Sequence, residues 1–325
     1  MPVHDLGYRA WPGRRISDLF RWWVIAHTGI RLAWRKAYLR RMLLFAWGPV
    51  VFGAIAFFAF EQTVEQSPGS LQFFVGFLDS FDGRGEFRDV IRDVRVDPHA
   101  ARHRVWTTLM MILFRQPQAI LMVMIVGLTA PALIANDMRS RAFLLYFSRP
   151  ITPWEYVLGK SVVVWTFILL ITLLPAMLLY VLAVLLSPDL SVIWSTWDLP
   201  LRIVLASAVL VIPTTALALC FSAMTRESRY ATFGWFALWI LGWVSYSILT
   251  TIDAANSSTR DPASAFSSSR WTLLSPFHTL GEVQSFVFGL RGSFADVLPE
   301  AMVLLTVTVF SLAIMLRRVT APIRV

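Results

Sequence analysis

The sequence predicts an all-α polytopic membrane protein with six transmembrane helices, because of its composition and of six long apolar segments. Hydrophobic residues make up 57% of the 325 residues and charged residues 15%, against roughly 25% charged residues in a soluble domain. The mean hydropathy is +0.62. A helix needs about 20 residues to cross the hydrocarbon core of a bilayer. The segments that approach this length are 42–60, 119–135, 161–186, 201–223, 231–251 and 297–316.

Residues 1–41 precede the first crossing and predict a basic amphipathic helix that lies in the plane of the lipid headgroups. Ser17 is the expected N-cap and Asp18 lies in the first turn. The residues expected on one face are Phe20, Trp23, Val24 and His27. A basic anchor and a mechanical elbow remain open as roles for this helix. The apolar run begins only at residue 42 and spans a bilayer, unlike the short core of a cleaved signal peptide.

The basic residues predict which connections face the cytoplasm, because cytoplasmic loops carry an excess of Lys and Arg. Residues 1–41, 136–160, 224–230 and the tail after residue 316 together hold 18 basic and 5 acidic residues. The alternate connections hold 10 basic and 14 acidic residues. We therefore expect both termini in the cytoplasm. The formal charge of +9 reflects this topology, and no nucleic-acid partner is expected.

The transmembrane domain, residues 42–325, contains two long insertions that are expected outside, 61–118 and 252–296. In the first, Phe87, Val90, Ile91 and Val94 repeat at helical spacing among mixed charges, which predicts a small external helix. The second ends in an apolar stretch, Trp271–Leu290, that is too short and too interrupted to cross a bilayer. We expect a re-entrant or interfacial hairpin there, before the sixth crossing.

Patterns typical of metal and cofactor sites are weak, so no metal and no cofactor is expected. Cys220 is the one cysteine and lies in an apolar run, which excludes an internal disulfide and a Cys-based metal site. His99 and His103 are four residues apart, but they follow Pro98 and lack the glutamate of an H-E-x-x-H zinc motif. We interpret this pair as part of a solvated loop.

The stretch from Phe147 to Ser161, "FSRPITPWEYVLGKS", ends like a phosphate-binding loop but does not have its geometry. The motif G-x-x-x-x-G-K-[ST] needs a glycine where this chain has Trp154. Thr152 and Glu155 instead predict a capping box, with proline at the first helical position. Lys160 then lies inside the third crossing helix, as a cytoplasmic anchor that extends towards the headgroups. The chain therefore has no nucleotide site of its own.

Residues 136–148 are expected to form a short cytoplasmic helix between the second and third crossings. Asp137 precedes Arg141 by one turn, which is the favourable order for an ion pair on a helix. Pro150 ends this helix, because the residue before a proline disfavours the α conformation.

This arrangement resembles the permease subunit of an ABC transporter, of the six-helix type-2 ABC exporter permease family. The residues that carry the resemblance are Asp137, Arg139, Arg141, Leu144, Leu145, Ser148, Arg149, Pro150, Thr152, Glu155, Gly159, Lys160 and the run Leu274–Leu280. The chain departs from the family at Asp137, where glutamate is more usual, and in the length of 61–118, which leaves room for an external partner. The resemblance implies a permease dimer, here a homodimer, that is bound by two cytoplasmic ABC ATPase subunits.

The resemblance also makes 136–148 the coupling helix that contacts the ATPase. The expected coupling residues are Asp137, Arg139, Arg141, Phe143, Tyr146 and Arg149. In the fifth crossing Trp235, Trp239 and Trp243 recur every four residues and form one stripe. This stripe is a candidate for the dimer axis or the translocation path, and lipid contact or packing within one subunit remains open.

We expect a transport subunit in a bacterial inner membrane, surrounded by lipid, that works as an exporter while a partner chain hydrolyses ATP. The centres of the crossings lack the ionisable residues that ion-coupled transporters use as ion sites. A non-transporting scaffold or sensor, a membrane enzyme and a secondary transporter remain the alternatives.

Overall fold

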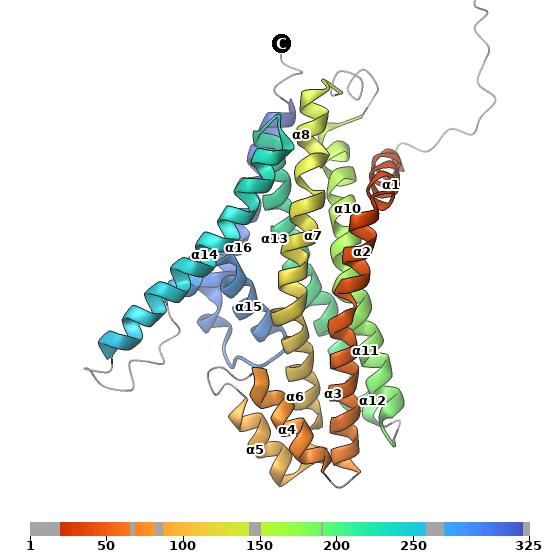
Figure 1. Ribbon diagram of the computed structural model, residues 1–325, viewed down its shortest axis with the longest axis vertical. Coiled ribbons are helices and arrows are strands. Elements are labelled where there is room, and N and C mark those ends of the chain that lie inside the picture. Colours follow the sequence, from red (N-terminus) through yellow and green to blue (C-terminus); the bar gives the residue numbers. More distant parts are fainter. Residues whose placement is uncertain are drawn as a thin grey trace, which may run out of the picture.

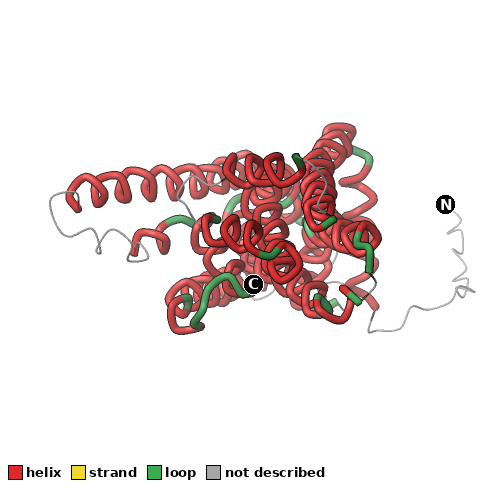
Figure 2. Tube along the Cα trace, turned by 90° about the horizontal axis from the view of Figure 1, so that it is seen from below, coloured by secondary structure: helices red, strands yellow, loops and turns green. Residues whose placement is uncertain are grey.

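The computed structural model describes most of the chain, and the regular elements in the described part are all helical (Figures 1 and 2). The described residues are 20–65, 69–81, 87–142, 151–189, 191–257 and 270–320. The prediction of an all-α protein is confirmed.

Within these ranges, 6 helical segments are long and apolar enough to cross a membrane. They are Ala37–Val64, Ala119–Arg139, Pro153–Leu186, Asp198–Met224, Ser228–Asp253 and Leu298–Thr320. Each overlaps one of the predicted segments, so the six crossings are confirmed as helices. Most extend beyond the prediction because their first or last turns contain polar and charged residues, such as Asp198 and Arg139, that end the apolar run.

The first three crossings are each built from two consecutive helices. These are α2 (Ala37–Ala46) and α3 (Gly48–Val64), α7 (Ala119–Thr129) and α8 (Pro131–Arg139), and α10 (Pro153–Ile171) and α11 (Leu173–Leu186). Pro49 and Pro131 stand in the first turn of α3 and α8, where a missing N–H is tolerated but the preceding helix is interrupted. The other three crossings are α13 (Asp198–Met224), most of α14 (Ser228–Ser257) and α16 (Leu298–Thr320).

Helix α13 forms the centre of the bundle, in contact with α8, α10, α14 and α16. In an apolar stretch of 18 residues of α13, 67% of the stretch is buried inside the protein. The corresponding share is 22% in α14 and 17% in α16. Helix α14 leans away from the other helices along much of its length (Figure 1). Most of the surface of α14 and α16 is therefore available to lipid or to a second subunit.

The end of the bundle opposite α8 carries the small helices of the insertion 61–118, namely α4 (Ser70–Phe81), α5 (Arg88–Val96) and α6 (Pro98–Leu113) (Figure 1). Val90, Ile91 and Val94 are buried, which confirms the helix predicted from their spacing. Helix α6 continues through a π-helical turn, η2 (Phe114–Gln118), into α7. Pro117 lies inside that turn, and a π-helical turn is a common way to accommodate such an interruption.

The expectation of a solvated loop around His99 and His103 is wrong. Asp97 is the N-cap of α6, and its Oδ1 accepts hydrogen bonds from the backbone N–H of His99 at 2.9 Å and of Ala100 at 3.2 Å. Both histidines therefore lie in the first two turns of a helix. Among the described residues, no group of three or more His, Cys, Asp or Glu side chains is placed to hold a metal ion.

Two further elements lie beside the crossings. Helix α1 (Arg21–Trp34) packs along α10, with Ile25 and Ala26 buried. The predicted face with Phe20, Trp23 and Val24 is exposed, and its proposed caps Ser17 and Asp18 lie outside the described residues.

Before α16, the chain forms η4 (Arg270–Leu274), α15 (Pro276–Val287) and η5 (Phe294–Asp296). Helix α15 has 12 residues, too few to cross a bilayer, and it packs against α13, α14 and α16. A short helix, α12 (Val192–Ser195), joins α11 to α13.

Candidate functional site between α8 and α10

Helix α10 begins at a capping box that fixes the direction in which the chain enters the third crossing. Thr152 Oγ1 accepts a hydrogen bond from the backbone N–H of Glu155 at 3.3 Å, and Glu155 Oε2 accepts one from the backbone N–H of Thr152 at 2.7 Å. The predicted capping box is confirmed. The capping box stabilises the first turn of α10. Tyr156 and Lys160 follow it, one turn apart on the same side of the helix.

Lys160 is a buried ion-pair partner, and the prediction of an anchor that extends to the headgroups is wrong. Its Nζ lies 2.7 Å from Asp137 Oδ2, and the two side chains are 10% and 18% exposed. The Tyr156 hydroxyl, which is fully buried, donates to the same Oδ2 at 2.8 Å. The end of α8 is thus tied to α10 by one carboxylate that receives a cation and a hydroxyl.

Gly159 gives α10 a second contact, with α1. A Cβ on Gly159 would lie 2.8 Å from the backbone oxygen of Trp22 and 2.8 Å from Cβ of Ile25. Only glycine lets the two helix backbones approach so closely. The sequence Gly-Lys-Ser therefore serves a close helix contact and an ion pair, and its likeness to a phosphate loop has no structural counterpart.

The expected helix over 136–148 does not continue past Arg139 in the described residues. Ser140 is the C-cap of α8, Arg141 has φ 54°, and the Ala142 N–H bonds to the carbonyl of Asp137 at 3.0 Å. This left-handed ending is a Schellman motif. Because Arg141 leaves the helix, Asp137 pairs with Lys160 and not with Arg141, contrary to the prediction.

The remaining predicted coupling residues are placed as follows. Arg139 is exposed and lies 3.7 Å from Glu227, which precedes α14. Arg141 is exposed as well. Phe143, Tyr146 and Arg149 lie outside the described residues.

Ser222 in α13 forms hydrogen bonds with the backbone of α8 near its N-terminal end. The sequence analysis did not identify this residue. Its Oγ accepts hydrogen bonds from the backbone N–H groups of Ile134 and Ala135, each at 3.0 Å, and donates to the carbonyl of Pro131 at 2.7 Å. These backbone groups lie at the break between α7 and α8, where the helical ladder is incomplete. A serine in an apolar run is a weak signal, since it gives no hint of which neighbouring backbone it contacts.

The tryptophan stripe of the fifth crossing is divided between the interior and the surface. Trp235 is fully buried, and its Nε1 donates to the carbonyl of Val123 at 2.9 Å. Trp239 is 6% exposed and lines an apolar cavity, whereas Trp243 is 56% exposed. Packing within one subunit therefore accounts for two of the three rings, and Trp243 alone retains a surface for another chain.

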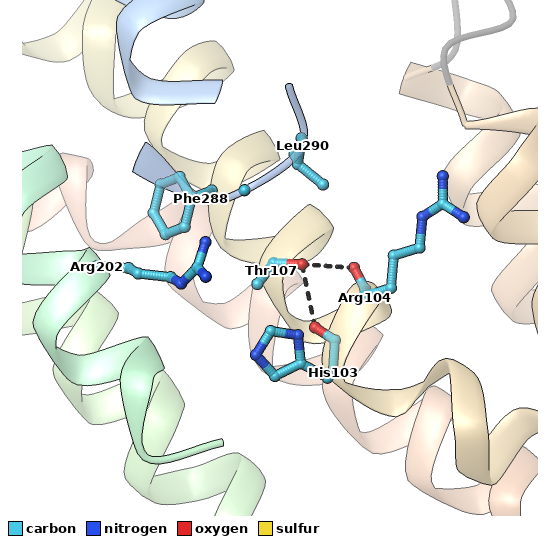
Figure 3. A pocket seen from close by; sticks show the side chains of 7 residues that line it. His103, Arg104, Thr107, Arg202, Phe288 and Leu290 are labelled. Atoms are coloured by element: carbon cyan, nitrogen blue, oxygen red, sulfur yellow. Dashed lines mark hydrogen bonds between the residues drawn. The ribbon is translucent and has the colours of Figure 1, made fainter. Parts of the chain in front are cut away.

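A second cavity, of about 220 Å³, lies between α6, α13 and the turn after α15 (Figure 3). His103 and Arg104 reach it from α6 and Arg202 from α13, but carboxylates already pair with all three. Asp198 lies 2.9 Å from His103 Nε2 and 2.6 Å from Arg202 Nε, and Asp93 lies 2.5 Å from Arg104. These contacts hold the insertion against the bundle, so we assign this cavity a structural role.

Comparison with known proteins decides the class of the chain. A family model described as "ABC-2 family transporter protein" matches residues 40–322. The chain belongs to the ABC-2 family. It is an integral membrane permease of the ABC transporter class. No curated protein matches the sequence of this ABC-2 permease. The match includes the first crossing from residue 40 onwards, the other five crossings, both insertions and the site between α8 and α10, whereas α1 precedes it.

Proposed function

We propose that this ABC-2 permease is the membrane subunit of an exporter in a bacterial inner membrane. In this proposal it functions as a homodimer with both termini in the cytoplasm, and a separate ABC ATPase binds the segment 136–148. The basic excess of the connection between α8 and α10 supports the cytoplasmic position of that segment. The observation that carries the proposal is the buried contact of Asp137 with Lys160 and Tyr156.

That contact supports coupling because it lies where the segment joins the membrane helices. An ATPase bound to the exposed residues after α8 would move Asp137, and Lys160 would carry this movement into α10. Removing one partner of a buried ion pair costs about 3–5 kcal/mol, so the two helix ends move together. The movement is a rigid-body displacement of one helix against another, as in other switching transitions.

The same site supports a role for α1 as the elbow suggested by its sequence. Through Gly159, α1 is packed on α10 within one residue of the ion pair. A displacement of α10 therefore also displaces α1, which has one exposed apolar face. We propose that α1 transmits the movement to the membrane surface and does more than anchor the chain.

Binding of the ATPase can be tested with substitutions that add negative charge to the segment 136–148. We expect Arg139→Glu and Phe143→Asp to abolish co-purification of a tagged permease with the ABC ATPase encoded beside it. Arg92→Glu is the matched control, because Arg92 is 71% exposed at the opposite end of the molecule. If Arg139→Glu and Phe143→Asp accumulate normally and bind the ATPase as the wild type does, the segment 136–148 is not the docking site.

A further inference from the structure

The chain passes from α1 into the first crossing through a strongly basic segment. Residues 19–60 contain six Arg and Lys residues and no Asp or Glu. Five of these cations lie between the last turn of α1 and the second turn of α2. They are Arg31, Arg35, Lys36, Arg40 and Arg41, and we call them the basic joint. Like charges so close together repel one another, so an anion beside them stabilises the joint.

The side chains of the basic joint have no carboxylate partner. Its four arginines are exposed, and Lys36 is half-buried. Among the residues that the structure describes, no Asp or Glu forms an ion pair with any of the five. By contrast, both arginines of α6 are paired, Arg102 with Glu61 and Arg104 with Asp93. The described part of the chain therefore leaves the joint free to bind an anion from another molecule.

The protein holds the basic joint in a fixed place at the edge of the bundle (Figure 1). On the α1 side, Ala33 is buried and the Trp34 ring stacks on Phe167 of α10, with 6.3 Å between the ring centres. On the α2 side, Leu39 and Leu43 are buried. These contacts turn the other faces of both helices, which carry the cations, outward. The cations are therefore arranged before a ligand arrives, which lowers the entropic cost of binding.

Arg41 connects the basic joint with the lipid-facing surface of the first crossing. Leu44 and Phe45 follow it by three and four residues, so the three side chains share one face of α2. Leu44 is 77% exposed and Phe45 is 73% exposed. Because α2 begins the crossing Ala37–Val64, this exposed apolar surface faces acyl chains. Arg41 stands one turn nearer the start of the helix, where a long basic side chain reaches the headgroups.

We infer that the basic joint binds an anionic phospholipid in preference to a zwitterionic one. The lipid phosphate lies among the guanidinium groups, which bind phosphate oxygens through paired N–H donors. The acyl chains of the same lipid cover Leu44 and Phe45. A zwitterionic headgroup brings its own cation into a site that already has five. A free phosphate ion lacks the acyl chains, and an acidic protein leaves the lipid-facing residues uncovered.

The test measures the binding of single lipids to the purified full-length permease, by native mass spectrometry from detergent. It needs neither the ATPase nor transport, so it stands apart from the proposed coupling. The probes are phosphatidylglycerol, which is anionic, and phosphatidylcholine with the same acyl chains, which is zwitterionic. A basic residue near an anionic headgroup contributes about fivefold to binding. We therefore expect the wild type to bind phosphatidylglycerol at least about tenfold more tightly than phosphatidylcholine.

Paired substitutions assign this preference to the basic joint. Arg35→Gln with Arg41→Gln removes two of its charges, so we expect the affinity for phosphatidylglycerol to fall at least about tenfold and that for phosphatidylcholine to change less than about twofold. Arg35→Lys with Arg41→Lys keeps both charges and retains most of the preference. Arg317→Gln with Arg318→Gln is the matched control, because these exposed residues at the end of α16 carry the same charge outside the joint. This control binds both lipids as the wild type does.

Three outcomes would overturn the inference. Equal binding of the two lipids by the wild type would leave the joint to an acidic protein. Displacement of phosphatidylglycerol by glycerol phosphate, which is its headgroup without acyl chains, would make the joint a site for a soluble phosphate. An equal loss in the α16 control and in Arg35→Gln with Arg41→Gln would mean that the preference reflects net charge alone. Thermal unfolding in the same detergent checks that each variant folds.

Discussion

Asp137 at the end of α8 and Lys160 two turns into α10 are joined by an ion pair of 2.7 Å inside the protein, with Tyr156 donating to the same carboxylate oxygen. The pair connects the segment proposed to contact an ATPase with a helix that crosses the membrane. It is formed by residues from two different helices, so its strength and its role in coupling can be measured separately.

The first prediction separates stability from coupling at this pair. Lys160→Met leaves a buried carboxylate uncompensated, and we expect the free energy of unfolding to fall by about 3 kcal/mol. The double variant Asp137→Leu, Lys160→Met replaces both partners by apolar groups and recovers part of that loss, since the Tyr156 hydroxyl loses Asp137 as an acceptor, whereas ATP-driven transport stays low. Thermal unfolding in detergent measures the first effect, and a transport assay measures the second. Wild-type transport by the double variant would show that the pair only stabilises the fold.

The second prediction concerns the contact between α1 and α10. Gly159→Ala places a methyl group against the backbone of Trp22, so we expect a loss of about 1–3 kcal/mol and faster hydrogen exchange in α1. Gly76→Ala is the matched control in the interior of α4, where an added Cβ meets no atom within 4 Å. That variant gains about 0.5–1 kcal/mol, because alanine suits a helix better than glycine. Unchanged exchange in α1 of Gly159→Ala would show that the two helices separate easily.

The third prediction tests Ser222 as the side chain that completes the break between α7 and α8. Ser222→Ala removes the hydroxyl that accepts from the backbone N–H groups of Ile134 and Ala135 and donates to the carbonyl of Pro131, and we expect a loss of about 2 kcal/mol. Ser207→Ala is the control in the same helix, since the Ser207 hydroxyl is equally buried but has no partner. Its unfolding free energy stays near that of the wild type. A similar loss in both variants would mean that the hydrogen bonds of Ser222 contribute nothing.

The fourth prediction uses the division of the tryptophan stripe. Trp235→Ala removes a fully buried ring and costs about 3–5 kcal/mol, whereas Trp243→Ala leaves the melting temperature of the subunit unchanged. In a Cys220→Ser background, we expect a disulfide between two subunits for Trp243→Cys and none for Trp239→Cys. Cross-linking at 239 with none at 243 would contradict the burial of these rings.

The fifth prediction fixes the orientation in the membrane. With Cys220 replaced by serine, a cysteine in Ser70→Cys reacts with an impermeant thiol reagent in intact cells. A cysteine in Ser228→Cys, at the first residue of α14, reacts only after permeabilisation. This follows from the excess of basic residues on one side of the bundle. The reverse pattern of labelling would place both termini outside.

The crossings could be predicted from the sequence because each depends on a local property, the length of an apolar run. The capping box at Thr152 and Glu155 was predictable for the same reason, since its partners are three residues apart. The partners of Lys160 could not be predicted, because they depend on how α8 meets α10. The helix expected through Arg141 failed for a related reason. The helix ends at Arg141 in the left-handed conformation, which is usually adopted by glycine. An arginine at this position therefore does not indicate a helix end in the sequence.

The burial of Trp235 could not be predicted from the sequence either. Spacing every four residues places three rings on one helix face, but it does not say how deeply each ring lies in the bundle. Helix α14 leaves the bundle along its length, so the stripe runs from the interior at Trp235 to the surface at Trp243. Ser222 was missed because its three partners are main-chain atoms, which leave no trace in the residue types around them.

The close contact at Gly159 also sets an order of events during synthesis. Helix α1 leaves the ribosome first, but the glycine against which Ile25 packs follows about 130 residues later. At about 5–20 residues per second, α1 waits some 7–26 s for its partner. During this time an amphipathic helix of its kind rests among the headgroups. The N-terminal helix therefore docks only after two further crossings have been made, and a ribosome that stalls before α10 leaves it undocked.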